Sequence, residues 1–226
     1  SLLAAACWQQ DRRSDAMSLL ADRLDVIETA AGYAGSIGAY LVLVRMAALS
    51  GDEPRAFGFL EGLAAIGERR GTVRLGVVSL AERIRLHCAA RRPTQAAVLL
   101  TRLTNLVECS PASSLLAPQL RLEVSLAGAC TAIAASCMAD ARQHVREASE
   151  LALALNRGYE ATQALALEAL LADRSGQPAA PLLSEALSRA AGGGLVRVFA
   201  DTLPEVVDLV RRHAEGCTNS AVSAAF

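Results

Sequence analysis

Apolar residues recur at three- and four-residue spacing along almost the whole chain, and short runs of glycine, proline or polar residues interrupt them at regular intervals. This is the spacing of residues on one face of an α-helix. No segment shows the alternation of β-branched and polar residues that is typical of a strand. The pattern therefore predicts an all-α protein.

One helical pattern occurs five times. In each copy an alanine is followed four residues later by a large apolar residue. The alanines lie 40, 40, 45 and 38 residues apart, at Ala16, Ala56, Ala96, Ala141 and Ala179. A second helical stretch separates consecutive copies. The spacing predicts repeated helix pairs of about 40 residues each.

This recurrence assigns two alternating sets of helices. The first set covers 14–31, 53–69, 94–109, 140–156 and 178–191, and should end at Gly32, Gly71, Pro111, Gly158 and Gly192. The second set covers 33–50, 72–91, 113–137 and 159–174, with residues 1–10 as the tail of another helix.

A helix pair of this kind cannot bury both of its apolar faces alone, so neighbouring pairs must stack. We expect residues 1–191 to form a TPR-like right-handed α-solenoid of about five helix pairs, the first one truncated. The second set of helices would line its concave side and the first set its convex side. Small residues would let neighbouring helices approach closely, at Gly35, Gly38, Gly58, Gly62, Gly76 and Gly128.

Residues 192–216 depart from the repeat. Gly192, Gly193 and Gly194 indicate a helix stop and a sharp turn rather than a phosphate-binding loop, because no lysine follows them. We expect a short extended stretch in which Phe199 is buried, and then a helix from about Leu203 to Glu215. A capping box from Thr202 to Glu205 would open that helix, and residues 217–226 would form a linker or frayed tail.

Composition narrows the function classes. The chain is 53% hydrophobic and 20% charged, which excludes disorder. Its 22 basic residues are all arginine and are balanced by 23 acidic ones, so we expect no binding to nucleic acid by this chain. The longest uncharged runs, 29–44 and 124–139, are shorter than the roughly 20 residues of a membrane span. A soluble, cytoplasmic protein without membrane contact is therefore expected.

Reactive residues are scattered. The six cysteines form no Cys-x-x-Cys pair and should be reduced, mostly buried thiols without a metal. His144 and Glu147 lie on a charged helix face, and His87 beside Cys88 is typical of a packed helix. The sequence therefore favours a non-catalytic protein, with an all-α enzyme as the least supported class.

One polar stripe stands out. Arg74, Val78, Ala81 and Arg85 share one helix face, and Arg45 occupies the position of Arg85 one repeat earlier. In later repeats the stripe continues through Gln119, Glu123, Leu126 and Cys130, and then through Ala161, Ala164 and Glu168. We predict a groove for a polar ligand or extended peptide, with the candidate ligand-binding residues Arg45, Arg74, Arg85, Gln119, Glu123 and Glu168. The alternative is that these charges only solvate the ends and edges of the helices.

The terminal segment carries a resemblance. Gly194, Arg197, Phe199 and Asp201, followed by Pro204 and an apolar helix, resemble the end of the TPR-like sensor domain in MalT-type, ATP-dependent regulators of the LuxR family. The resemblance implies an effector-sensing and self-associating module of a transcription regulator, cut from a longer protein.

In that family an ATP-binding domain lies upstream and a DNA-binding helix-turn-helix downstream, and neither motif occurs in these 226 residues. We therefore expect no cofactor in this chain, and a small-molecule or peptide effector as its partner. The alternative is a TPR-like scaffold that binds a partner protein and has no role in transcription.

Overall fold

The computed structural model describes residues 1–110 and 115–216, and every regular element in those ranges is helical. The predicted helix start at 113, Pro111, the predicted tail 217–226 and Cys217 lie outside the described residues. The elements are α1 (Leu2–Gln9), α2 (Arg13–Leu20), α3 (Leu24–Ala30), α4 (Tyr33–Leu49), α5 (Glu53–Arg69), α6 (Val73–Ala89), α7 (Pro93–Glu108), α8 (Ala117–Ala134), α9 (Met138–Ala154), α10 (Gly158–Arg174), α11 (Ala180–Gly193), the 3-10 helix η1 (Val196–Val198) and α12 (Pro204–Gly216).

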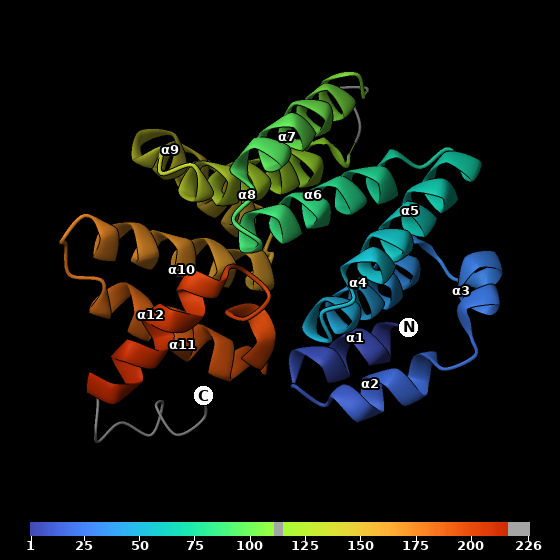
Figure 1. The fold of residues 1–226 in the computed structure, drawn as a ribbon, viewed down its shortest axis with the longest axis horizontal. Coiled ribbons are helices and arrows are strands. Elements are labelled where there is room, and N and C mark those ends of the chain that lie inside the picture. Colours follow the sequence, from blue (N-terminus) through green and yellow to red (C-terminus); the bar gives the residue numbers. More distant parts are fainter. Residues whose placement is uncertain (111–114, 217–226) are drawn as a thin grey trace.

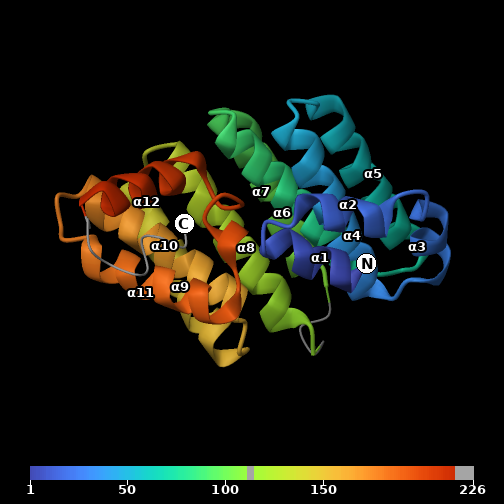
Figure 2. The same ribbon diagram turned by 90° about the horizontal axis from the view of Figure 1, so that it is seen from below.

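Consecutive helices pack side by side as hairpins, visible in Figure 1 as the pairs α4–α5, α6–α7, α8–α9 and α10–α11. Helices of alternate rank also touch, since α1 packs on α4 and α6 packs on α8. The prediction of an all-helical chain is confirmed for the described residues. Figure 2 shows that the terminal segment before α12 returns to the first helix, so the two ends of the chain lie together.

The helix junctions share one backbone device. The amide of Thr72 donates to the carbonyl of Gly67 at 2.8 Å and closes α5, and Gly71 between them has a positive φ of 61°. The equivalent bond recurs at the ends of α4, α6, α8, α9 and α10. The left-handed residues of the described chain are Asp11, Asp22, Gly51, Gly71, Arg91, Ser136, Asn156, Gly176 and Gly194.

The aligned alanines lie where helix pairs pack most closely. Ala16, Ala56, Ala96 and Ala141 are all 0% exposed, whereas Ala179 is the partly exposed residue before α11. The predicted pattern therefore marks the buried face of four helices and is out of register in the fifth copy.

Glycines at the helix contacts behave unequally. A Cβ on Gly128 would lie 2.7 Å from the His144 ring, which shows that α8 and α9 need a glycine there. A Cβ on Gly58 would meet no atom within 4 Å, so the predicted close approach at that residue is wrong.

Several predicted boundaries are wrong. The predicted helix 14–31 is two helices, α2 and α3, because the chain turns at Asp22, whose φ is 54°. Gly158 begins α10, and the left-handed residue that ends α9 is Asn156. Gly192 lies inside α11, and Gly194 provides its left-handed cap.

The segment after α11 also differs from expectation. The predicted extended stretch is the 3-10 turn η1. The Thr202 hydroxyl donates to the Val198 carbonyl at 2.7 Å instead of receiving the first amides of α12, so it braces the turn before the helix. Phe199 is 3% exposed, which confirms its predicted burial.

Cysteine burial is only partly as predicted. Cys7, Cys88 and Cys130 are free and buried, whereas Cys109 and Cys137 are exposed because each lies at a helix junction. Within the described ranges no helix combines the length and the apolar character that crossing a membrane requires.

The junction geometry predicts opposite effects for two Gly→Ala substitutions in or beside α5. Gly71→Ala should lower the free energy of unfolding by about 1–2 kcal/mol, because alanine is strained at positive φ. Gly58→Ala, inside the helix with open space around it, should raise that free energy by about 0.5–1 kcal/mol. Urea denaturation followed by circular dichroism measures both, and shifts of the same sign would contradict this account.

Candidate ligand-binding cavity

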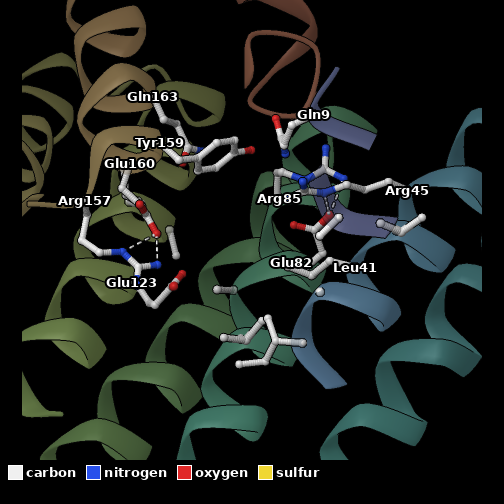
Figure 3. A pocket seen from close by; sticks show the side chains of 18 of the residues that line it. Gln9, Leu41, Arg45, Glu82, Arg85, Glu123, Arg157, Tyr159, Glu160 and Gln163 are labelled. Carbon is white, nitrogen blue, oxygen red and sulfur yellow. Dashed lines mark hydrogen bonds and ion pairs between the residues drawn. The ribbon is translucent and has the colours of Figure 1, made fainter. Parts of the chain in front are cut away.

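A cavity of about 240 Å³ lies among α1, α4, α6, α8 and α10 (Figure 3). Every one of these helices belongs to the set that was predicted to line the concave side. Apolar side chains, including Trp8, Leu41, Val78 and Leu126, form part of its wall. Charged side chains form the rest, so this space combines an apolar surface with polar groups, as binding sites for small molecules do.

The structure brings together four of the six predicted site residues. Arg45, Arg74, Arg85 and Glu123 line the cavity. The stripe on α6 is placed as expected, because Val78 and Ala81 between its two arginines also face this space.

The other two predicted site residues lie elsewhere. Gln119, one turn before Glu123 on α8, does not line the cavity, and Glu168 is exposed on α10. On α10 the cavity is lined by Tyr159, Glu160 and Gln163 instead of the predicted stripe. The repeat spacing of 45 residues before this copy displaces the alignment, so the predicted stripe falls on the wrong face of α10.

Glu82 joins two of the predicted arginines on one side of the cavity. Its Oε1 accepts from Arg45 Nε at 3.2 Å and from Arg85 Nη2 at 2.7 Å. Burial would raise the pKa of Glu82, but the charges of Arg45 and Arg85 outweigh this and hold it at about 2. These arginines therefore already have a carboxylate partner, which sequence reasoning did not provide.

Asp201 from the terminal segment lies behind this side of the cavity, 2% exposed. Its Oδ2 accepts from Trp8 Nε1 at 2.7 Å and from Arg45 Nη1 at 2.9 Å, and its Oδ1 accepts from Arg197 Nη2 at 3.0 Å. One carboxylate thus joins α1, α4 and the segment after α11. These bonds fix the position of Arg45 at the cavity.

Arg197 completes this junction. Its guanidinium lies over the Trp8 ring, 4.3 Å from the centroid, and its Nη1 donates to Asp11 Oδ1 at 3.2 Å. Arg197 is 6% exposed and Trp8 is 1% exposed. The terminal segment is therefore a packed part of the fold, joined to its first helix.

The opposite side of the cavity carries a different arrangement. Arg157, just before α10, pairs with Glu160 in the first turn of that helix through two hydrogen bonds. Glu123 lies below this pair in Figure 3 and makes no hydrogen bond or ion pair with any described residue. Burial raises the pKa of Glu123 to about 7, and the charge of Glu160 adds to this, while Arg157 and Arg74 oppose it.

Three buried polar atoms around the cavity have no hydrogen-bond partner in the described chain: the Tyr159 hydroxyl, Gln9 Oε1 and Arg85 Nε. In Figure 3 the Tyr159 hydroxyl points across the cavity toward Gln9 and Arg85. Buried polar groups are normally paired, so such atoms around a cavity indicate that a ligand or water completes them. Burial also raises the pKa of Tyr159 to about 12, so its hydroxyl stays protonated and can donate.

Two kinds of site residue escaped prediction. Glu82 and Glu160 had a local signal, because each lies three residues from the arginine it pairs with on a helix. Trp8 had none, since its partner Asp201 lies 193 residues away.

The cavity does not contain an activated nucleophile. Cys130 lines it, and burial raises the pKa of this thiol, as burial raises that of neighbouring Cys88 to about 11. Both thiols are therefore neutral at neutral pH and poor nucleophiles. In the described ranges no three His, Cys, Asp or Glu side chains are grouped so as to hold a metal ion.

Comparisons with protein-family models, curated proteins and solved structures found no match to this chain. The resemblance carried by Gly194, Arg197, Phe199 and Asp201 therefore stays a prediction. The cavity is interpreted below from its own chemistry.

The environment of Glu123 predicts a pH-dependent stability. Between pH 4.5 and about 7 the folded chain keeps a proton that the unfolded chain has lost, so the stability contributed by protonated Glu123 is lost as pH rises through 7. Glutamine cannot ionise, so Glu123→Gln should be more stable than the wild type by roughly 3 kcal/mol near pH 8 and by little near pH 5. Urea denaturation at both pH values measures this difference.

The matched control is Glu185→Gln, which removes an exposed carboxylate paired with Arg189. It should show no comparable change between the two pH values. An equal stability difference for Glu123→Gln at both pH values would mean that this carboxyl group has an ordinary pKa.

Proposed function

We propose that this chain is an effector-sensing module, a non-catalytic domain that binds a small polar molecule in the cavity among α1, α4, α6, α8 and α10. The observation that carries the proposal is the set of buried, unpaired polar atoms around that cavity, on Tyr159, Gln9 and Arg85. A structural core would leave such atoms paired. A bound molecule would complete them.

The finer architecture belongs to the same proposal. The alternating contacts of the helices and the recurring left-handed junctions support a TPR-like right-handed solenoid with repeats of about 40 residues. In this interpretation the helices that carry the cavity are the concave layer. The segment with Arg197 and Asp201 would then close the solenoid against its first helix.

The proposed context is a cytoplasmic MalT-type regulator of the LuxR family. The support is that Arg197, Phe199 and Asp201, which carry the resemblance, are all buried in the joint between the terminal segment and the solenoid. An ATP-binding domain before residue 1 and a DNA-binding domain after residue 226 are part of this proposal. Self-association would use exposed apolar side chains such as Leu2 and Leu3, which are 63% and 62% exposed.

A second candidate is the partner-binding scaffold. It is favoured by an open hollow on α5, α6 and α7, lined by Phe57, His87 and Val98, because Val98 is 53% exposed there. That hollow lies apart from the cavity, since the two share no lining residue. Ligand binding in the cavity would favour the sensor.

Cavity filling tests the sensor. Ala81 lines the cavity, and Ala81→Phe should occupy part of it, whereas Ala97→Phe places the same ring on the exposed face of α7. The 226-residue chain is equilibrated with a metabolite extract, and the retained molecules are identified by mass spectrometry. We expect the wild type and Ala97→Phe to retain the same small molecule and Ala81→Phe to lose it at least tenfold. Equal retention by all three, or no retention, would contradict the proposal.

A further inference from the structure

The ionic side chains in the cavity wall divide into paired and unpaired groups. Glu82 is paired with Arg45 and Arg85, and Glu160 is paired with Arg157. These interactions build the wall and leave little free charge to attract a ligand.

The unpaired groups are one residue of each sign. Arg74 on α6 and Glu123 on α8 line the cavity, and neither makes a hydrogen bond or an ion pair with any residue in the described ranges. The two helices pack against each other, and the charge of Arg74 lowers the pKa of Glu123. The side chains are therefore close enough to interact through space, yet no direct contact joins them.

Unpaired charges in a partly apolar cavity are costly unless a ligand completes them. A simple amine would satisfy Glu123 alone, and a simple carboxylate would satisfy Arg74 alone. A molecule that carries both groups would satisfy the two side chains together. We propose that the cavity binds a small zwitterion, a free α-amino acid, with its ammonium group on Glu123 and its carboxylate on Arg74.

The charge balance of the site agrees with a ligand of zero net charge. The wall contains Arg45, Arg74, Arg85 and Arg157 against Glu82, Glu123 and Glu160, and the bond from Asp201 to Arg45 supplies the fourth negative charge. A volume of about 240 Å³ lies near the lower end of the range for ligand pockets, so it suits one small molecule.

The partnerless atoms on the other side of the cavity favour a polar side chain on this amino acid. The Tyr159 hydroxyl and Arg85 Nε can donate hydrogen bonds, and Gln9 Oε1 can accept one. A purely apolar side chain would leave all of them unpaired.

The test rests on the proposed sensor function and uses the twenty standard L-amino acids as probes. Each is added at millimolar concentration to the 226-residue chain, and the change in Tm is recorded by scanning fluorimetry. At least one amino acid with a polar side chain should raise Tm. Calorimetry then gives its Kd for the wild type and the variants.

We expect Glu123→Gln and Arg74→Gln each to weaken the affinity at least about tenfold. The matched controls Glu185→Gln and Arg189→Gln alter an exposed ion pair on α11 and should leave Kd unchanged. Removing the amino group of the best probe should have the same effect as Glu123→Gln, and removing its carboxylate the same effect as Arg74→Gln. Circular dichroism checks that each variant keeps its helices.

The outcomes separate the two proposals. If a sugar or an organic anion binds in a manner that Ala81→Phe abolishes, and no amino acid binds, the zwitterion inference is overturned while the sensor function stands. Undiminished affinity of an amino acid for Glu123→Gln and Arg74→Gln also overturns the inference. If the wild type binds nothing from the extract or from the amino acid set, both proposals fail.

Discussion

The Asp201 carboxylate is the interaction on which the rest of the structure depends. It accepts hydrogen bonds from Trp8, Arg45 and Arg197, which belong to the first helix, the fourth helix and the terminal segment. Such a buried charge is tolerable only because three donors, two of them cationic, surround it. The position of the terminal segment against α1, and with it the geometry of Arg45 at the cavity, follows from this arrangement.

The same bonds connect the terminal segment to the cavity. Arg45 holds Asp201 with one nitrogen and Glu82 with another, and Glu82 in turn holds Arg85, which lines the cavity. A continuous set of charged hydrogen bonds therefore runs from Trp8 to the ligand-facing wall. A molecule that bound beside Arg85 would rest on a wall that the terminal segment helps to position.

The sequence predicts the helices well because their signals are local. Apolar periodicity and helix-stopping residues act within a few positions, and Ala56 and Ala96 are fully buried where the recurring pattern predicts buried positions. The signals fail where a non-glycine residue adopts the left-handed conformation, as Asp22 does between α2 and α3. Aspartate and asparagine tolerate this conformation, yet they occur in many other contexts, so their presence alone does not locate a turn.

The candidate site was predictable only in part. Arg74 and Arg85 were found because their spacing places them on one face of a single helix. Tyr159 was missed because the repeat alignment loses register before α10. The contact between Trp8 and Asp201 was missed because nothing local connects residues 193 positions apart.

Trp8 is the only tryptophan in the chain, so its fluorescence reports directly on the joint between the two ends. The most direct test is acrylamide quenching of Trp8 in the folded wild type and in Asp201→Ala. The account predicts a protected indole in the wild type and a much more accessible one in the variant, with most of the helical circular dichroism retained. An indole that is accessible in the wild type, or equally protected in both proteins, would contradict it.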